Sequence, residues 1–193
     1  MSYGIANVTG QASLEDVMRM LDLAQRAGVD TLDTARAYGE SEAVIGQALA
    51  EGAGWRVVTK IDPSVCTPEI TAAAVEAGVL GSLELSLHLL GRETLDVVLL
   101  HRPEHRLACG GAAWRALSAA RASGQVDAIG VSATSPETAL EAVSAEGVEV
   151  MQVATSLIDR RLVTQGFFEL AAAHEVEVHL RSVFLQGVAF MAP

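Results

Sequence analysis

Six short apolar runs recur along this chain, and helix-like segments separate them. The runs extend over residues 29–33, 56–60, 96–101, 127–132, 150–154 and 177–181. Some of them, such as Val97-Val98-Leu99-Leu100, are apolar throughout, which is typical of parallel strands that are covered on both faces. The alternation predicts an α/β fold with right-handed crossover connections.

The intervening segments carry the start and stop signals of helices. Ser13 and Ser135 are suited to cap helix N-termini, and Gly28 and Gly91 follow segments that should end there. We expect helices over residues 14–27, 42–50, 67–90, 111–122, 135–144 and 164–174. At 193 residues, without a linker-like or low-complexity stretch, the chain is expected to form one domain over residues 1–193.

A doubly wound sheet and a TIM-barrel-like sheet both show this alternation of strands and helices, and two observations favour the barrel. No Gly-x-Gly-x-x-Gly turn follows an early strand, as a dinucleotide-binding doubly wound fold would require. Polar residues also recur at the carboxyl ends of several predicted strands, where barrels place their active sites. We therefore predict a TIM-barrel-like parallel sheet of about six βα units.

Charge and composition narrow the classes of partner. A net charge of -11 argues against nucleic acid and against an anionic membrane surface. No run of about 18 apolar residues indicates a membrane span, and the N-terminus lacks the layout of a signal peptide. Cys66 and Cys109 have no CxxC spacing, so we expect two ordinary thiols in a cytoplasmic protein.

Four polar residues stand at, or just past, the ends of the first three predicted strands: Asp33, Tyr38, Lys60 and His101. An acid, a phenol, an amine and an imidazole at one rim of a sheet make a plausible proton-transfer site. Each residue taken alone has a simpler interpretation, such as a helix cap, a turn residue or a surface charge. Four such residues at successive strand ends favour a catalytic site.

These residues lie in segments with a family resemblance. Gly28–Glu42, with its Asp33 and Tyr38, resembles the signature of the aldo-keto reductases, and Val58-Thr59-Lys60 and Leu99-Leu100-His101 resemble their third and fourth strands. Later segments, Gly130-Val131-Ser132 among them, resemble cofactor-contacting strand ends. The resemblance implies a barrel that reduces the carbonyl group of a small substrate with NADPH or NADH.

The resemblance also implies a role for each of the four residues. Tyr38 would protonate the carbonyl oxygen, and Lys60 would lower the pKa of the Tyr38 phenol from its usual value of about 10. Asp33 would pair with Lys60, and His101 would orient the carbonyl. The cofactor contacts that the resemblance implies are Ser132, Gln152, Arg181, Ser182, Leu185 and Gln186.

Two residues depart from the family pattern. Ala133 follows Ser132 where the family usually has an asparagine, which would remove one amide contact to the nicotinamide. Arg181 takes the place of an aromatic residue that often stacks on the ring; a guanidinium can also stack, but it carries charge.

The six predicted strands correspond to the second to seventh of the family's eight, so the barrel is expected to be incomplete and truncated, without the first and eighth. Three hypotheses follow. The sequence belongs to a longer reductase, or it is a shortened relative whose exposed sheet edges suit a homo-oligomer. Alternatively, it is a catalytically silent relative that acts as a binding or scaffold protein.

Two other kinds of chemistry are less favoured. His101 and His105 could suggest a metal pair, but Pro103 between them disrupts helical geometry and no third ligand is evident, so we expect no metal. Lys60 could form a Schiff base in a lyase or isomerase, but a nearby Asp33 would favour the ammonium form.

Overall fold

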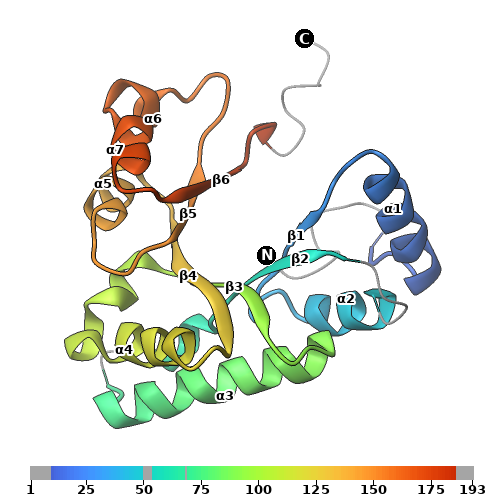
Figure 1. Cartoon of the computed structure of the whole chain (residues 1–193), viewed down its shortest axis with the longest axis horizontal. Helices are drawn as coiled ribbons and strands as arrows, with labels where there is room; N and C mark the ends of the chain where they lie inside the picture. Colours follow the sequence, from blue (N-terminus) through green and yellow to red (C-terminus); the bar gives the residue numbers. More distant parts are fainter. Residues whose placement is uncertain (1–9, 50–53, 68, 186–193) are drawn as a thin grey trace.

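A computed structural model describes residues 10–49, 54–67 and 69–185 of the chain (Figure 1). Within them one sheet holds six parallel strands in the order β1-β2-β3-β4-β5-β6, so each strand pairs with its neighbours in sequence. The strands are β1 Thr31–Asp33, β2 Arg56–Lys60, β3 Leu95–Leu100, β4 Val126–Ala133, β5 Val150–Ala154 and β6 Glu177–Arg181. The predicted number and direction of the strands are confirmed.

The connecting helices are α1 Leu14–Arg26, α2 Ser41–Leu49, α3 Ala72–Leu90, α4 Ala108–Ala122, α5 Pro136–Val143, α6 Arg161–Thr164 and α7 Phe167–Ala173. Two 3-10 turns, η1 Pro63–Val65 and η2 Pro103–Arg106, follow β2 and β3. The expected caps are present, since the Ser13 side chain accepts from the backbone of Asp16 and Ser135 forms a capping box with Thr138. Gly91 ends α3 in a left-handed conformation, with φ 64°.

Three predicted helices differ from the observed ones. The helix expected from residue 67 begins at Ala72, because the side chain of Thr71 caps it by accepting from the backbone of Ala74. The helix expected over residues 164–174 is divided into α6 and α7 by Gly166, whose φ is 73°. α4 begins earlier than expected but contains left-handed backbone at residues 109–111, so its regular part starts near the predicted position.

The sheet curls into an incomplete barrel with helices on its convex side (Figure 1). Side chains from strands that are not neighbours meet across the concave face. Gln152 of β5 donates to Asp33 of β1 over 2.7 Å, and Arg56 of β2 donates to Glu177 of β6 over 2.8 Å. The predicted TIM-barrel-like, incomplete α/β architecture is confirmed.

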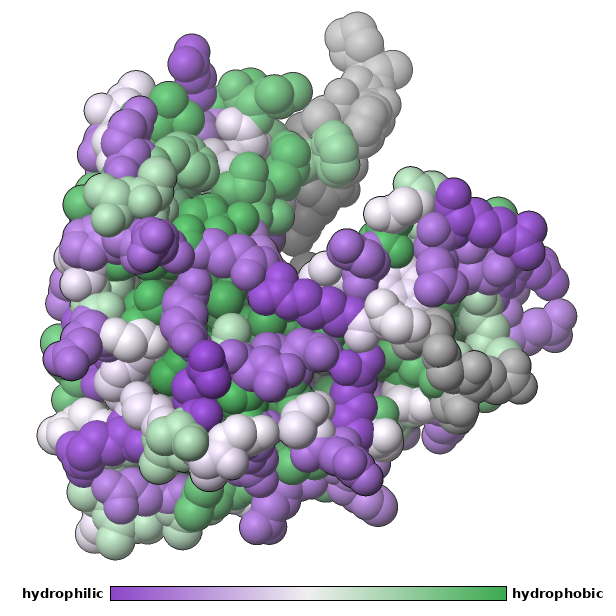
Figure 2. Space-filling model, in the orientation of Figure 1, coloured by the Kyte–Doolittle hydropathy of each residue, from purple (hydrophilic) through white to green (hydrophobic). Residues whose placement is uncertain are grey.

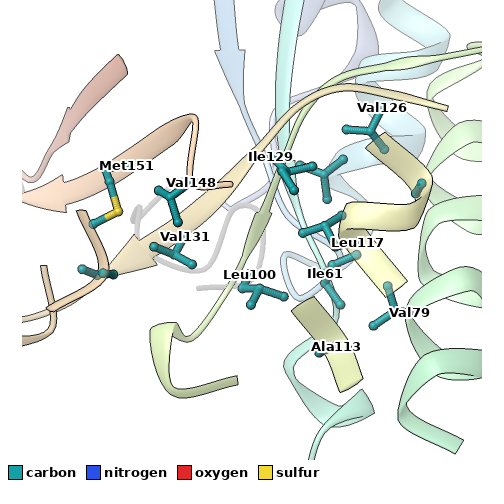
Figure 3. Packing of buried hydrophobic residues seen from close by; sticks show 14 of the residues in the cluster. Ile61, Val79, Leu100, Ala113, Leu117, Val126, Ile129, Val131, Val148 and Met151 are labelled. Carbon is teal, nitrogen blue, oxygen red and sulfur yellow. The ribbon is translucent and has the colours of Figure 1, made fainter. Parts of the chain in front are cut away.

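The main hydrophobic core lies between the convex face and the helices. Figure 3 shows side chains of the strands packed against those of α3 and α4, including Val79, Leu117 and Ile129. A smaller cluster lines the concave face and consists of Val58, Val97, Leu99 and Val150. Because side chains alternate between the faces of a strand, these four fix which positions point inward.

α3 is the one helix in the described part of the chain that is long and apolar enough to cross a membrane by length and composition alone. In this fold it packs beside α2 and α4 (Figure 1), and core residues such as Val75, Val79 and Leu83 lie along it.

Candidate active site

The period-two alternation of the strands places the candidate residues on the concave face. Val58 points inward, so Lys60 does too; Leu99 points inward, and His101 follows at the same parity. By the same rule Asp33, Ser132 and Gln152 take inward positions at the carboxyl ends of their strands. In a parallel barrel these ends meet at one rim.

Lys60 is the most constrained of these residues, and it is the only lysine in the chain. Its side chain is 1% exposed, and Nζ donates to Asp33 Oδ1 over 2.7 Å and to the backbone oxygen of Thr34 over 2.8 Å. Burial lowers the pKa of Lys60, and the charge and hydrogen bond of Asp33 oppose this shift. The Asp33 side chain is 43% exposed, so the pair faces the open rim from one side.

Tyr38 lies on the turn that follows β1. The backbone of this turn is held on β2, because the amide of Thr34 donates to Val58 and that of Arg36 donates to Lys60. The Tyr38 ring contacts two of the other candidates: its centroid is 5.1 Å from Lys60 Nζ and 5.8 Å from the His101 ring, which it meets edge-on at 88°. The structure therefore brings Asp33, Tyr38, Lys60 and His101 together, as the sequence predicted.

The pKa of Tyr38 shifts in the direction opposite to the predicted one. Burial and, after it, the negative charge of Asp33 raise the pKa of the phenol above 10.0, whereas Arg181 lowers it. The net shift is therefore upward, opposite in direction to the depression expected from Lys60. Tyr38 is thus a phenol, not a phenolate, at neutral pH.

His101 is held in its neutral form. Burial first, and then the positive charge of Lys60, lower the pKa of its imidazole to about 4. Its Nδ1 is buried and has no hydrogen-bond partner among the described residues. A neutral imidazole has one N–H donor and one acceptor, so His101 has unused hydrogen-bonding capacity.

Two of the predicted cofactor contacts extend this cluster. Ser132 and Gln152 are directly paired residues of β4 and β5, and Ser132 Oγ donates to Gln152 Oε1 over 3.1 Å. Gln152 Nε2 in turn donates to Asp33 over 2.7 Å. Each residue can form a further hydrogen bond, because Ser132 Oγ can still accept one and Gln152 Nε2 has a second N–H to donate.

The other predicted cofactor contacts lie at the end of β6 and in the segment after it. Arg181 donates from Nη2 to the backbone oxygen of Ala133 over 3.1 Å, and its Nε is buried without a hydrogen-bond partner among the described residues. Ser182 and Leu185 both have left-handed backbone, with φ 63° and φ 49°. Gln186 lies outside the described residues.

A cavity of about 370 Å³ opens between the first two strands, β1 and β2, and the last two strands, β5 and β6. It is lined by Thr31, Asp33, Val58, Gln152, His179, Leu180 and Arg181. Figure 2 shows the molecule hollowed between the part that carries α1 and β1 and the part that carries β5 and β6. Gln152 and Arg181 line this cavity, and Ser132 lies beside Gln152 on the neighbouring strand. Their spare donors and acceptors suit a planar amide such as a nicotinamide carboxamide. Among the described residues, no group of three or more His, Cys, Asp or Glu side chains could hold a metal.

A buried glutamate behind the site escaped the sequence analysis. Glu42 is fully buried on α2; its Oε1 accepts from Thr59 Oγ1 over 2.6 Å and from Ser86 Oγ over 2.8 Å, and Oε2 pairs with Arg36. These contacts fasten the turn that carries Tyr38 to β2 and α3. The available signal was a charged residue at the start of the otherwise apolar Ala43-Val44-Ile45 stretch.

Comparison with known proteins gives one consistent match. The sequence model of the Aldo/keto reductase family matches residues 1–191. A 6-dehydroglucose reductase of Agrobacterium fabrum is 30% identical over 192 residues, which cover 91% of this chain and 64% of that protein. An aldo-keto reductase of Mycobacterium sp. (strain JLS) is 32% identical over 142 residues, or 72% of this chain and 48% of that protein.

Solved structures show the same fold. The holo form of an aldo-keto reductase from Bacillus halodurans has a TM-score of 0.75 at 21% identity, covering 94% of this chain and 60% of that chain. An aldo/keto reductase from Brucella melitensis has a TM-score of 0.69 at 21% identity, with coverage of 95% and 68%. The chain spans 64% and 48% of the length of the two curated relatives described above.

Proposed function

The chain belongs to the aldo/keto reductase family, and from this premise we propose that it reduces an aldehyde or a ketone to an alcohol with NADPH or NADH as the hydride donor. The observation that carries the proposal is the contact of the Tyr38 ring with both Lys60 and His101 at one rim of the barrel. This arrangement puts a proton donor, a cation and a neutral imidazole around one point.

Tyr38 is the proton donor in this proposal. When hydride reaches a carbonyl carbon, the oxygen becomes an alkoxide, which is far more basic than a phenolate. The raised pKa of Tyr38 therefore does not prevent transfer, and it keeps the phenol protonated at neutral pH. The Lys60 ammonium stabilises the phenolate that remains, and Asp33 holds that ammonium in place.

His101 orients the substrate. As a neutral imidazole it has one N–H to donate to the carbonyl oxygen, and it adds no positive charge beside Lys60. A hydrogen bond from His101 and a proton from Tyr38 would converge on the same oxygen, because the two rings are 5.8 Å apart at their centroids. General acid catalysis of this kind contributes about 10²- to 10⁴-fold to the rate.

A reduced nicotinamide, when bound, supplies the hydride. Its holding residues in the proposal are Ser132, Gln152, Arg181, Ser182, Leu185 and Gln186. Ser132 and Gln152 would take the carboxamide with their spare acceptor and donor, and the unpaired Nε of Arg181 would give a further donor. Because Gln152 also binds Asp33, a cofactor contact at Gln152 would be linked directly to the Lys60 pair. We propose the cytoplasm as the compartment, since the structure holds both cysteines as free thiols.

NADPH binding and turnover by this 193-residue chain test the proposal. Binding is followed by the change in reduced-nicotinamide fluorescence, and turnover by loss of its absorbance on addition of an aromatic aldehyde. We expect saturable binding and aldehyde-dependent oxidation. Binding without turnover for a panel of aldehydes and ketones, or no binding of NADPH or NADH, would contradict the proposal and favour a silent binding protein.

A further inference from the structure

The two cysteines of the chain meet although they are far apart in the sequence. Cys66 lies after η1 and Cys109 lies at the start of α4, yet their sulfur atoms are 3.8 Å apart. They are the only cysteines in the sequence, and both are free thiols. Their sequence positions gave no sign of this contact, which depends on how α3 and α4 pack beside each other.

The backbone around Cys109 can accommodate a further approach of the two sulfurs. A disulfide requires an S–S distance of about 2.05 Å, so the sulfurs must move closer by about 1.8 Å. Cys109 has φ 52°, an unfavourable conformation for a residue with a side chain, and Gly110 and Gly111 follow it with φ 64° and φ 77°. Two glycines can change conformation at little steric cost, so this segment can adjust as Cys109 moves.

The two thiols have different access to solvent. Cys66 is buried, whereas Cys109 is partly exposed. Burial, and then the contact with Cys109, raise the pKa of Cys66 to about 11, so Cys66 remains protonated at neutral pH. A cavity of about 570 Å³ adjoins both cysteines and is also lined by Ile70, Arg102, Glu104 and His105. A small molecule therefore has a route to the pair, with Cys109 as the more accessible sulfur.

We propose that Cys66 and Cys109 form a dithiol site that exchanges with low-molecular-weight disulfides and closes an intramolecular disulfide bond. The Cys109 thiolate attacks one sulfur of the disulfide RSSR, forms a Cys109–S–S–R bond and releases RS⁻, which takes up a proton. Cys66 then loses its proton and attacks the Cys109 sulfur, which releases the second RS⁻. Two protein thiols are oxidised, and one RSSR is reduced to two RSH.

This site is independent of the proposed reductase chemistry, because neither cysteine contacts Asp33, Tyr38, Lys60 or His101 in any described interaction. Closing the bond would join the segment before α3 to the start of α4. Cys109 already contacts the first segment through its sulfur, which lies 3.6 Å from the backbone oxygen of Ile70. The bond would therefore reinforce an existing contact rather than create a new one.

Glutathione disulfide is a suitable probe of this site. The reduced, full-length chain is incubated with it and treated with an alkylating reagent; intact mass and peptide mapping then give the state of each cysteine. We expect the number of free thiols in the wild type to fall from two to zero, with no glutathione retained and no crosslinked dimer. Reduction with dithiothreitol should restore both thiols.

Two single variants test the order of the steps. Cys66→Ala removes the resolving thiol, so it should accumulate one glutathione on Cys109. Cys109→Gly suits the left-handed backbone at that position, and its buried Cys66 should remain unmodified under the same exposure. Circular dichroism serves as the control that each variant is folded. A stable glutathione adduct on the wild type, two thiols that remain free, or modification of Cys66 in Cys109→Gly would overturn the proposal.

Discussion

Gln152 Nε2 lies 2.7 Å from Asp33 Oδ1, although β5 and β1 are separated in the sheet by β2, β3 and β4. The same Asp33 oxygen accepts from Lys60 Nζ at 2.7 Å. One carboxylate therefore does two things. It neutralises the buried ammonium, and it holds together strands that the sheet order keeps apart.

This double role predicts that Asp33→Asn destabilises the fold. The amide has nearly the same shape and its oxygen can still accept a hydrogen bond, but it removes the negative charge that compensates the buried Lys60 ammonium. The loss is about 3–5 kcal/mol for a fully buried pair. Because Asp33 is 43% exposed, we expect a smaller loss of about 1–3 kcal/mol. Urea unfolding measures it.

Asp22→Asn is the matched control, since Asp22 pairs with Arg26 on the exposed face of α1, with side-chain exposures of 52% and 74%. Surface pairs of this kind contribute less than about 1 kcal/mol. Equal free energies of unfolding for the two variants would refute the proposed role of Asp33.

Lys60 should titrate below its ordinary pKa of 10.5, because burial disfavours the ammonium. As the only lysine, it should give one side-chain signal in protein labelled with [ε-¹⁵N]lysine, whose shift against pH measures the pKa. Asp33→Asn should lower the pKa further, since Asp33 favours the charged form. A pKa at or above the ordinary value would contradict the described burial.

The sign of the linked stability effect follows from this shift. A lysine whose pKa is lower in the folded state makes the folded protein bind fewer protons than the unfolded chain between the two pKa values. The Lys60 contribution to stability should therefore rise as pH increases through the folded-state pKa. The comparison is the wild type against Lys60→Met, with unfolding measured at several alkaline pH values.

The rate of carbonyl reduction should be nearly independent of pH from about 6 to about 9, since His101 is neutral and Tyr38 is protonated over this range. The pKa of His101 is about 4, and that of Tyr38 is raised above 10.0. Alcohol oxidation uses the phenolate and should increase with pH towards the Tyr38 pKa. A reduction rate that falls between about pH 6 and about pH 8 would show that a charged histidine is needed.

Two helical glycines should respond oppositely to alanine. A Cβ at Gly46 in α2 would lie 2.0 Å from the backbone oxygen of Leu89, whereas a Cβ at Gly81 in α3 meets nothing within 4 Å. Gly46→Ala should lose at least about 1–3 kcal/mol of stability through overpacking, and Gly81→Ala should gain up to about 1 kcal/mol of helix propensity. A neutral Gly46→Ala would contradict the close approach of α2 to the end of α3. Thermal unfolding of both variants, compared with the wild type, measures these changes in stability.

The strands and the inward-facing residues were predictable because they depend on local patterns. Apolar runs identified the six strands, and polar residues at their ends indicated Asp33, Lys60 and His101. The start of α3 was predicted too early because Thr67 and Thr71 both offer a capping side chain, and only the folded chain shows that Thr71 caps the helix. The division between α6 and α7 depends on the left-handed backbone of Gly166, inside a segment that otherwise suits one helix.

The features that escaped prediction depend on distant parts of the chain. The Glu42 network needs Thr59 and Ser86 to converge on one carboxylate, and no local spacing encodes that convergence. The contact of Cys66 with Cys109 likewise arises from packing. The direction of the Tyr38 pKa shift could not be inferred from residue types, because it depends on how strongly burial and Asp33 outweigh the positive charge of Arg181.

Tyr38 donates the proton in the proposed carbonyl reduction, and Tyr38→Phe removes this donor alone. The variant retains the ring that contacts Lys60 and His101 and removes only the hydroxyl. We predict that aldehyde reduction falls by about 10²- to 10⁴-fold, while NADPH binding and the free energy of unfolding stay close to those of the wild type. Reduction at the wild-type rate in a folded, NADPH-binding Tyr38→Phe protein would contradict the account.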